Sequence, residues 1–368
     1  MLARTAFERF KVSGIQGRYL PPEKLETFLV SRLSRAGLRV LGYSVQNRPV
    51  YGVRLGQGPT RVLMWSQMHG NESTSTKSVL DFINGLHTKW GNPYLEAFEF
   101  LFIPMLNPDG ALAYTRQNAN QVDLNRDARS QSQPESIILR KAYEEFSPHF
   151  CFNLHDQRTI YSAGENPQPA TLSFLAPAAT PQKAFTDSRK AAAQLIAELS
   201  RPMRNTIGIG RYDDTFNPDC VGDFFQSAGT PTLLFEAGHF PGDYQREETR
   251  FYACQALHNA LTAIRLNSYK KASVAEYMEI PENQSRFVDI LICNAHHLNE
   301  KYVPGTRVGL QYTEILEGQQ IHFRPVIEHE GELKEYFGHE LWDAARPEHL
   351  SQLRESRLLF DLFRPTSS

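Results

Sequence analysis

The sequence lacks the features that would place a protein in a membrane or on nucleic acid. No segment is apolar over the roughly 20 residues that a membrane-spanning helix needs. The amino-terminal stretch MLARTAFERFKVSG has no apolar core of a signal peptide. Lysine and arginine number 39 against 41 acidic residues, and the basic residues are scattered. We therefore expect a cytoplasmic protein with no nucleic-acid and no membrane partner, and we leave the oligomeric state open.

Cysteine is also scarce. The four residues, Cys151, Cys220, Cys254 and Cys293, are far apart and form no CxxC pair. In a cytoplasmic protein we expect reduced thiols rather than disulfides. Internal repeats and low-complexity tracts are absent as well, which argues against a repeat architecture.

What the sequence does contain is an alternation of strand-like and helix-like segments. Of its 368 residues, 41% are hydrophobic and 22% are charged, as in globular proteins. The strand-like segments are almost uninterrupted apolar runs, which is typical of strands buried on both faces. We predict an α/β fold with a mixed, largely parallel sheet and helices on both of its faces. The expected strands are 50–55, 61–65, 98–106, 151–155, 171–178 and 230–238; the expected helices are 22–36, one from Ser73 or Thr74 to residue 86, 134–146, 183–200 and 243–264.

The pattern changes near residue 268. Residues 267–277 are polar and are interpreted as a linker. The segments that follow alternate with a period of two, as antiparallel strands do, and a helix-like stretch comes last. We predict a main domain over 1–267, and a linker with a small β-rich module of unknown role over 268–368. The segments of that module are 287–293, 307–316, 321–329 and 349–363.

Two side chains in the stretch MHGNEST point to a metal site. His69 and Glu72 follow the apolar run 61–65, at the carboxyl edge of the sheet, where open α/β sheets bind ligands. An imidazole and a carboxylate three residues apart can both face one Zn²⁺ ion. A single HxxE occurs often by chance, so the pair alone is weak evidence.

His155 offers a third ligand at the same edge of the sheet. It ends the apolar run CFNLH, and taken alone it could be a core histidine bonded to a backbone carbonyl. Together with His69 and Glu72 it forms the His₂Glu set of a catalytic zinc site, with the fourth position left for water.

Further ionisable residues follow other strands at this edge. Glu236 comes after four apolar residues, where a carboxylate is costly unless it has a use. Its natural use is as general base for a zinc-bound water, although an exposed turn glutamate is the alternative. Arg116, Asn125 and Arg126 lie in a polar stretch after the run 98–106. Arginine suits carboxylates and oxyanions, yet composition alone also allows an ordinary surface loop.

Five motifs in this order resemble the zinc carboxypeptidase family, of which carboxypeptidase A is the familiar member. The resemblance covers about residues 15–265 and implies a carboxypeptidase-like fold. It implies an enzyme that uses one Zn²⁺ per chain to hydrolyse a C-terminal peptide bond, on a substrate with a free carboxylate. The motifs are HGNE at 69–72, NPDG at 107–110, RxNAxxVDLNRD at 116–127, NLHD at 153–156 and FEAG at 235–238.

The resemblance also assigns roles to residues. His69, Glu72 and His155 would bind zinc, and Glu236 would be the general base. Arg116 would polarise the scissile carbonyl, and Asp123 would orient His69. Asn125 and Arg126 would hold the terminal carboxylate of the substrate. Tyr212 is the nearest candidate for the mobile tyrosine of the family, in a loop where Asp213, Asp214 and Asp219 could favour a basic substrate side chain or be solvated loop acids.

Two other functions stay open. Zinc amidohydrolases of the aspartoacylase and succinylglutamate desuccinylase type, which act on N-acyl amino acids, share HxxE, DLNR and a β-rich carboxyl-terminal module. The NPDG segment and the length of the loop before His155 favour the peptidase. A non-catalytic zinc-binding protein on the same scaffold is the second alternative.

Overall fold

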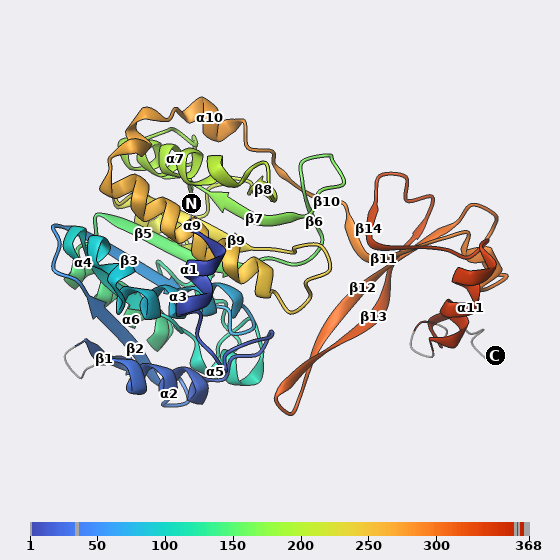
Figure 1. The fold of residues 1–368 in the computed structure, drawn as a ribbon, viewed down its shortest axis with the longest axis horizontal. Coiled ribbons are helices and arrows are strands. Elements are labelled where there is room, and N and C mark those ends of the chain that lie inside the picture. The colour runs from blue at the N-terminus through green and yellow to red at the C-terminus, as the bar shows by residue number, and fades with distance from the viewer. Residues whose placement is uncertain (1, 34–36, 357–358, 360, 364–368) are drawn as a thin grey trace. The chain divides into compact units, whose positions relative to one another are not determined.

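The structure is a computed structural model that describes residues 2–33, 37–356, 359 and 361–363. It divides into two compact units (Figure 1). The larger unit comprises Met1–Gln157 and Ala170–Asn283, and the smaller unit comprises Arg158–Pro169 and Gln284–Ser368. The predicted division into a main domain over 1–267 and a module over 268–368 stays a prediction.

The larger unit is built on an eight-stranded sheet with the order β1-β2-β4-β3-β5-β9-β7-β8. Its four central neighbours β4, β3, β5 and β9 are parallel, whereas β1, β2 and β7 pair antiparallel with their inner neighbours. The predicted mixed, largely parallel sheet is confirmed. The strands are β1 Leu38–Tyr43, β2 Pro49–Leu55, β3 Thr60–Ser66, β4 Phe98–Ile103, β5 Phe150–Asp156, β7 Ala170–Leu175, β8 Gly208–Arg211 and β9 Thr232–Ala237.

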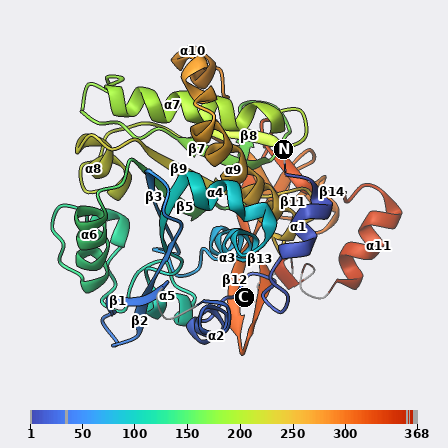
Figure 2. The same cartoon turned by 60° about the vertical axis from the view of Figure 1, so that its left-hand side comes forward.

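Helices cover both faces of this sheet, as can be followed in Figure 2. α3 (Thr74–Leu86), α7 (Asp187–Ser200) and α9 (Glu247–Arg265) pack on one face. α6 (Pro134–Phe146) and α8 (Val221–Ser227) pack on the other. The remaining helices of the larger unit are α1 Arg4–Phe10, α2 Pro22–Arg32, α4 Asn92–Ala97, α5 Pro108–Ala113 and α10 Val274–Met278.

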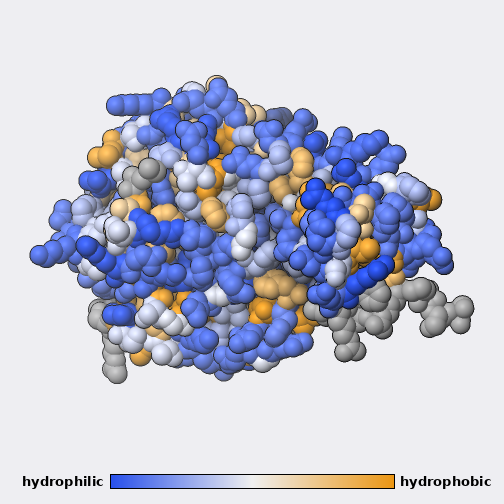
Figure 3. All heavy atoms as spheres, turned by 45° about the vertical axis from the view of Figure 1, so that its right-hand side comes forward, coloured by the Kyte–Doolittle hydropathy of each residue, from blue (hydrophilic) through white to orange (hydrophobic). Residues whose placement is uncertain are grey.

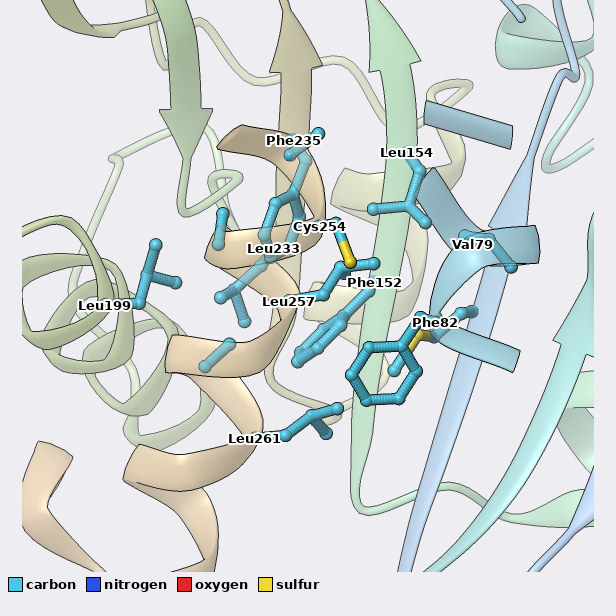
Figure 4. Packing of buried hydrophobic residues seen from close by; sticks show 14 of the residues in the cluster. Val79, Phe82, Phe152, Leu154, Leu199, Leu233, Phe235, Cys254, Leu257 and Leu261 are labelled. Carbon is cyan, nitrogen blue, oxygen red and sulfur yellow. The ribbon is translucent and has the colours of Figure 1, made fainter. Parts of the chain in front are cut away.

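The core under α3, α7 and α9 is apolar and close-packed (Figure 4). Phe152 of β5 and Phe235 of β9 lie with ring centroids 5.2 Å apart, and side chains of the three helices pack around them. Burial of each such side chain contributes about 1.5–3 kcal/mol, so this face holds β5 and β9 firmly in place. The helix residues labelled in the figure are Val79, Phe82, Leu199, Cys254, Leu257 and Leu261.

Several predicted boundaries differ from the observed ones. The strand expected at 98–106 ends at Ile103, because Pro104 cannot donate to a ladder. The helix expected at 243–264 begins at Glu247, since the carboxylate of Asp243 accepts N–H groups of its first turn. The helix expected at 22–36 ends at Arg32, and residues 34–36 of that prediction lie outside the described residues.

The segment interpreted as a polar linker is structured. It forms a 3₁₀ turn, Ser268–Lys271, and the helix α10, which packs against α7. Ser273 and Glu276 form a capping box at the start of α10. Tyr269, Ala272 and Tyr277 are buried, so the few apolar residues of this polar segment are enough to anchor it.

The smaller unit contains a four-stranded sheet with the order β13-β12-β11-β14, which confirms the predicted β-rich module. Its core combines strand residues such as Ile290, Ile292 and Leu310 with Leu353 of α11. Residues 357–358 and 360 of the helix expected at 349–363 lie outside the described residues. The elements are β11 Phe287–Cys293, β12 Arg307–Glu317, β13 Gln320–Gly331, β14 Phe337–Asp343 and α11 Pro347–Glu355.

The surface agrees with the composition. The face drawn in Figure 3 is mostly hydrophilic, with hydrophobic residues in small separated groups. Among the described helices none combines the length and the apolarity that crossing a membrane requires. The four cysteines are free, and Cys151 and Cys254 are buried.

Lys77 is one of several charged side chains in the interior of the larger unit. Lys77 of α3 is completely buried, and its ammonium donates to the backbone oxygen of Gly17. Burial lowers the pKa of Lys77 to about 7; Glu247 opposes this shift and Arg250 adds to it. An unfolded lysine has a pKa of about 10.4, so between pH 7 and pH 10 the unfolded chain binds more protons at this position than the folded chain does.

Stability is therefore expected to rise with pH between about pH 7 and pH 10, as far as Lys77 contributes. The substitution Lys77→Met removes this contribution and should flatten the dependence of the free energy of unfolding on pH. Urea denaturation at several pH values measures it, with Lys141→Met, a change at an exposed lysine, as control. If the free energy of unfolding changed with pH equally in wild type and in Lys77→Met, the lowered pKa of Lys77 would be contradicted.

Candidate metal centre and its surroundings

A tight loop after β3 brings the first two metal-ligand candidates together. The backbone N–H of Glu72 donates to the oxygen of His69 at 3.1 Å, which closes one turn between them. Gln67 has a positive φ of 50°, and its side chain donates to the oxygen of Gly70 at 2.8 Å. A Cβ atom at Gly70 would lie 1.9 Å from the carbonyl carbon of Gly110, so only glycine allows the HGNE and NPDG loops to pack backbone against backbone.

His69, Glu72 and His155 converge at the carboxyl edge of the sheet. One candidate ligand atom of each lies within 4.8 Å of the others, and all three residues are buried. Nδ1 of His69 is 2.8 Å from Oε1 of Glu72, and Nδ1 of His155 is 2.9 Å from Oε2. The two Nδ1 atoms are 3.1 Å apart. The structure thus brings together the three residues that the sequence predicted as ligands.

This arrangement fits a zinc ion. Two ligand atoms about 2.0–2.1 Å from a tetrahedral Zn²⁺ are about 3.3 Å apart, close to the distances observed here. Two imidazole nitrogens in contact also need a cation or a proton between them to be stable when buried. Two histidines and one carboxylate form the ligand set of a catalytic zinc site and leave a position for water.

The protonation states of the three residues favour metal binding. Burial lowers the pKa of His155, which keeps its imidazole neutral. Burial acts to raise the pKa of Glu72, but the two histidines outweigh it and lower the pKa overall, so the carboxylate is ionised. For His69, burial is outweighed by Glu72 and Asp123, which raise its pKa. Protons therefore compete with a metal mainly at His69.

Asp123 and Arg116 surround the outer side of His69. Oδ1 of Asp123 is 3.1 Å from Nε2 of His69, so it can orient the imidazole and fix its tautomer, as the resemblance implied. The guanidinium of Arg116 contacts Asp123 at 3.0 Å and Glu72 at 3.5 Å. Arg116 is half exposed, so its guanidinium borders both the ligand cluster and solvent.

Glu236 lies on the strand next to His155. The two residues are directly paired in the parallel ladder of β5 and β9, which directs their side chains to the same face of the sheet. Burial, with the negative charges of Glu72 and Asp156, raises the pKa of Glu236 well above its usual value. A carboxylate with a raised pKa beside a metal site is suited to accept a proton.

Asn125 and Arg126 belong to a 3₁₀ turn, Leu124–Arg126, beside the start of α8. Oδ1 of Asn125 accepts the N–H of Val221 at 3.0 Å, which leaves Nδ2 to donate elsewhere. Nη1 of Arg126 donates to the oxygen of Asn125 at 2.7 Å and to Sγ of Cys220 at 3.1 Å. Within the described part of the chain, the exposed guanidinium of Arg126 forms no ion pair.

Tyr212 comes directly after β8. The backbone N–H of Tyr212 donates to Phe174 of β7, and no role of its ring follows from this contact. The carboxylate of Asp214 pairs with Lys183 at 2.9 Å and with Arg189, so it is already neutralised. Asp213 is exposed and accepts from Thr215 at 2.7 Å. A substrate role for Tyr212 stays a prediction.

The sequence did not predict a role for Asp156. Its carboxylate accepts the N–H groups of Thr74 at 2.7 Å and Ser75 at 3.0 Å, at the start of α3. Ser73, one of the two residues at which the helix was expected to begin, makes no capping bond and donates instead to the backbone oxygen of Arg18. The hydroxyl of Ser75 donates in turn to the oxygen of His155 at 2.6 Å. Asp156 therefore ties the strand of His155 to the helix that follows Glu72.

The other motif residues hold the loops. Asp109 of the NPDG motif accepts from Ser44 at 2.8 Å, from the N–H of Gln46 at 2.9 Å and from Arg48 at 2.6 Å. Asn107 donates to the oxygen of Met68 at 3.1 Å, next to His69. The NPDG motif is thus a support for the metal loop rather than a source of ligands.

Comparison with known proteins agrees with the resemblance predicted from the sequence. The model of the zinc carboxypeptidase family matches residues 28–168. Carboxypeptidase 2 of Trichophyton rubrum is 31% identical over 98 residues, which are 26% of this chain and 18% of that protein. The matched segment therefore spans less than a fifth of these relatives. Carboxypeptidase 2 of Trichophyton tonsurans matches to the same extent.

Solved structures share the fold. A metallo-carboxypeptidase from Burkholderia cenocepacia superposes with a TM-score of 0.55 and 18% identity, over 68% of this chain and 70% of that chain. Carboxypeptidase A from Helicoverpa armigera gives a TM-score of 0.53 and 13% identity, over 71% and 79%. At these identities the likeness establishes the fold alone. The predicted resemblance in sequence and the predicted fold are confirmed.

Zinc is expected to stabilise the protein. Addition of Zn²⁺ to metal-free protein should raise the melting temperature, because a ligand at 100 times its Kd adds about 2.7 kcal/mol. The rise in melting temperature should become smaller as the pH falls, because the pKa of His69 is raised and protons then compete with zinc for its imidazole. His155→Ala should abolish it, whereas His258→Ala, at a histidine of α9 bonded to Tyr94, should retain it. An unchanged response in His155→Ala would contradict the ligand set.

Asp156→Ala is expected to loosen both α3 and the ligand cluster. Loss of a helix cap costs about 0.5–2 kcal/mol, and loss of a residue that supports metal ligands costs about 10–100-fold in metal affinity. Denaturant titration and competition with a chelator measure the two effects. Asp187→Ala, an exposed acid in the first turn of α7, is the control. Unchanged zinc affinity in Asp156→Ala would limit its role to folding.

Proposed function

We propose that this protein is a zinc-dependent metallocarboxypeptidase that hydrolyses the C-terminal peptide bond of a substrate with a free carboxylate. The observation that carries the proposal is the convergence of His69, Glu72 and His155 within 4.8 Å, with Glu236 directly paired to His155 on the next strand. The match of residues 28–168 to the zinc carboxypeptidase family supports it. His69, Glu72 and His155 would hold the metal.

A zinc ion held there would supply a Lewis acid for the scissile carbonyl and would activate water as the nucleophile. Glu236 accepts the proton of the attacking water and passes it to the nitrogen of the leaving amine. The guanidinium of Arg116, at the border of the ligand cluster, donates N–H hydrogen bonds to the scissile carbonyl oxygen as negative charge develops there. Asp123 keeps the imidazole of His69 in the orientation that binding needs.

The proposed selection of a free carboxylate rests on Arg126 and Asn125. Nδ2 of Asn125 and the exposed guanidinium of Arg126 lie on the same turn, as two donors for one carboxylate. Hydrogen bonds to charged groups contribute about 1.5–3 kcal/mol each. A substrate whose terminal carboxylate is amidated loses both the charge and part of these bonds.

A mixture of peptides with free and with amidated C-termini tests the proposal. We expect release of single C-terminal residues from the free peptides, and at least about 10-fold lower kcat/KM for the amides. Glu236→Gln should lower kcat by about 10²–10⁴-fold, because it removes the general base. Arg126→Met should mainly raise KM, since it removes a binding charge.

The same assay separates the alternatives. N-acyl amino acids form a second arm, because an amidohydrolase of the aspartoacylase type would cleave these and leave peptides intact. Zinc-loaded protein that cleaves neither would favour a non-catalytic zinc-binding protein. Release of internal fragments would contradict the carboxypeptidase while leaving a zinc hydrolase in place.

A further inference from the structure

A buried arginine joins the two strands that carry His155 and Glu236. Arg246 is 1% exposed, and its side chain reaches the carboxyl ends of β5 and β9. Nη2 donates to the oxygen of Gln157 at 2.8 Å, and Nη1 donates to the oxygens of Ala237 and Gly238. Ala237 follows Glu236 directly, and Gln157 comes two residues after His155.

These carbonyl groups lie where both strands leave the sheet. Gln157 is the last residue of the larger unit before the chain enters Arg158–Pro169, which belongs to the smaller unit. The N–H of Gln157 donates to Ala237 at 2.9 Å, and this is the last rung between the two strands. Beyond this rung the guanidinium continues the connection, so β5 and β9 stay together where the ladder has ended.

The backbone at Arg246 is strained in support of this contact. Its φ is 62° and its ψ is 24°, which is a left-handed conformation that an arginine adopts at a cost. Hydrogen bonds of Asp243, which precedes Arg246, and of Thr249, which follows it, stabilise this turn. The N–H of Arg246 donates to the oxygen of Asp243, and the Asp243 carboxylate caps the first turn of α9. Thr249 donates to the oxygen of Gly238 at 3.0 Å as a second hold on the same carbonyl.

A second buried arginine, which lies within α9, gives a comparison. Arg250 forms a bidentate ion pair with Asp81 of α3, with both N–O distances at 2.6 Å, and donates to the oxygen of Ile15 at 2.5 Å. It thus ties a helix and the amino-terminal segment to α9, away from the strand ends. Arg246 differs because its guanidinium donates to backbone oxygens at the carboxyl ends of the two strands that carry His155 and Glu236.

We propose that Arg246 is a positioning residue that sets the separation between His155 and Glu236. The inferred effect of Arg246 on catalysis rests on the proposed function. Its inferred effect on zinc binding by His155 does not depend on any substrate. A lysine keeps the positive charge yet cannot reach three carbonyl oxygens with one planar group. Removal of the guanidinium therefore frees the strand end of His155 to move relative to the other ligands.

The test compares Arg246→Lys with Arg250→Lys in the full-length chain. The zinc dissociation constant is measured by competition with a chelator, and the melting temperature is measured on metal-free protein. We expect both variants to melt at a lower temperature. Only Arg246→Lys should weaken zinc binding, by about 10–100-fold, as changes around metal ligands do. If Arg246→Lys yields too little folded protein, Thr249→Val is used instead, because it removes the hydroxyl that donates to the oxygen of Gly238. We expect Thr249→Val to weaken zinc binding by a smaller factor than Arg246→Lys.

Kinetics give a second readout if the wild type cleaves peptides. In Arg246→Lys at saturating zinc, kcat should fall while KM stays within about threefold, because Asn125 and Arg126 are not touched. Equal zinc affinity in wild type, Arg246→Lys and Thr249→Val would overturn the inference and leave Arg246 a purely structural residue. A wild type without hydrolytic activity would refute the proposed function, and the zinc titration would still decide on Arg246.

Discussion

The structure of the site depends on one constraint, which is that two imidazoles and a carboxylate are buried in contact. The Nδ1 atoms of His69 and His155 are 3.1 Å apart, and Glu72 contacts both rings. Such a cluster is costly without a cation, so the surrounding chain has to hold it together. The Gly70–Gly110 packing fixes the loop of His69 and Glu72, and the carboxylate of Asp156 connects that loop's helix to the strand of His155.

The parallel sheet provides the second requirement, which is that residues far apart in sequence reach one edge. β3, β5 and β9 are neighbours and parallel, so their carboxyl ends coincide. Glu236 faces the same side of the sheet as His155 because the two are register partners. A shift of one residue in this register would turn Glu236 to the opposite face, under α3 and α9. The apolar core around Phe152 and Phe235 prevents that shift. Packing on the face under α3, α7 and α9 therefore keeps His155 and Glu236 together on the opposite face.

Sequence reasoning succeeded where the signal is local. Continuous apolar runs predicted β2, β3, β5 and β9, and the motif spacing predicted the three candidate ligands that the structure brings together. It missed β1, whose residues are only partly buried, and it interpreted α10 as a linker because few apolar residues anchor it. The roles of Asp156 and Arg246 were not predicted, because Thr74 is 82 residues from Asp156 and Gln157 is 89 residues from Arg246 in the chain. Only the folded topology indicates which backbone groups these charges hold.

The buried arginines of this protein differ from the exposed Arg126 in what their guanidinium groups contact. Arg246 and Arg250 are buried and donate to backbone oxygens or to a carboxylate, so their charge is used within the fold. Arg126 is exposed and donates to a carbonyl and a thiol, neither of which carries a formal charge at neutral pH. An anionic group of a substrate would complete its environment. Peptides and N-acyl amino acids both present a carboxylate, so this charge cannot separate the two substrate classes. Discrimination between the two substrate classes would therefore come from the groups that contact the acyl side of the scissile bond.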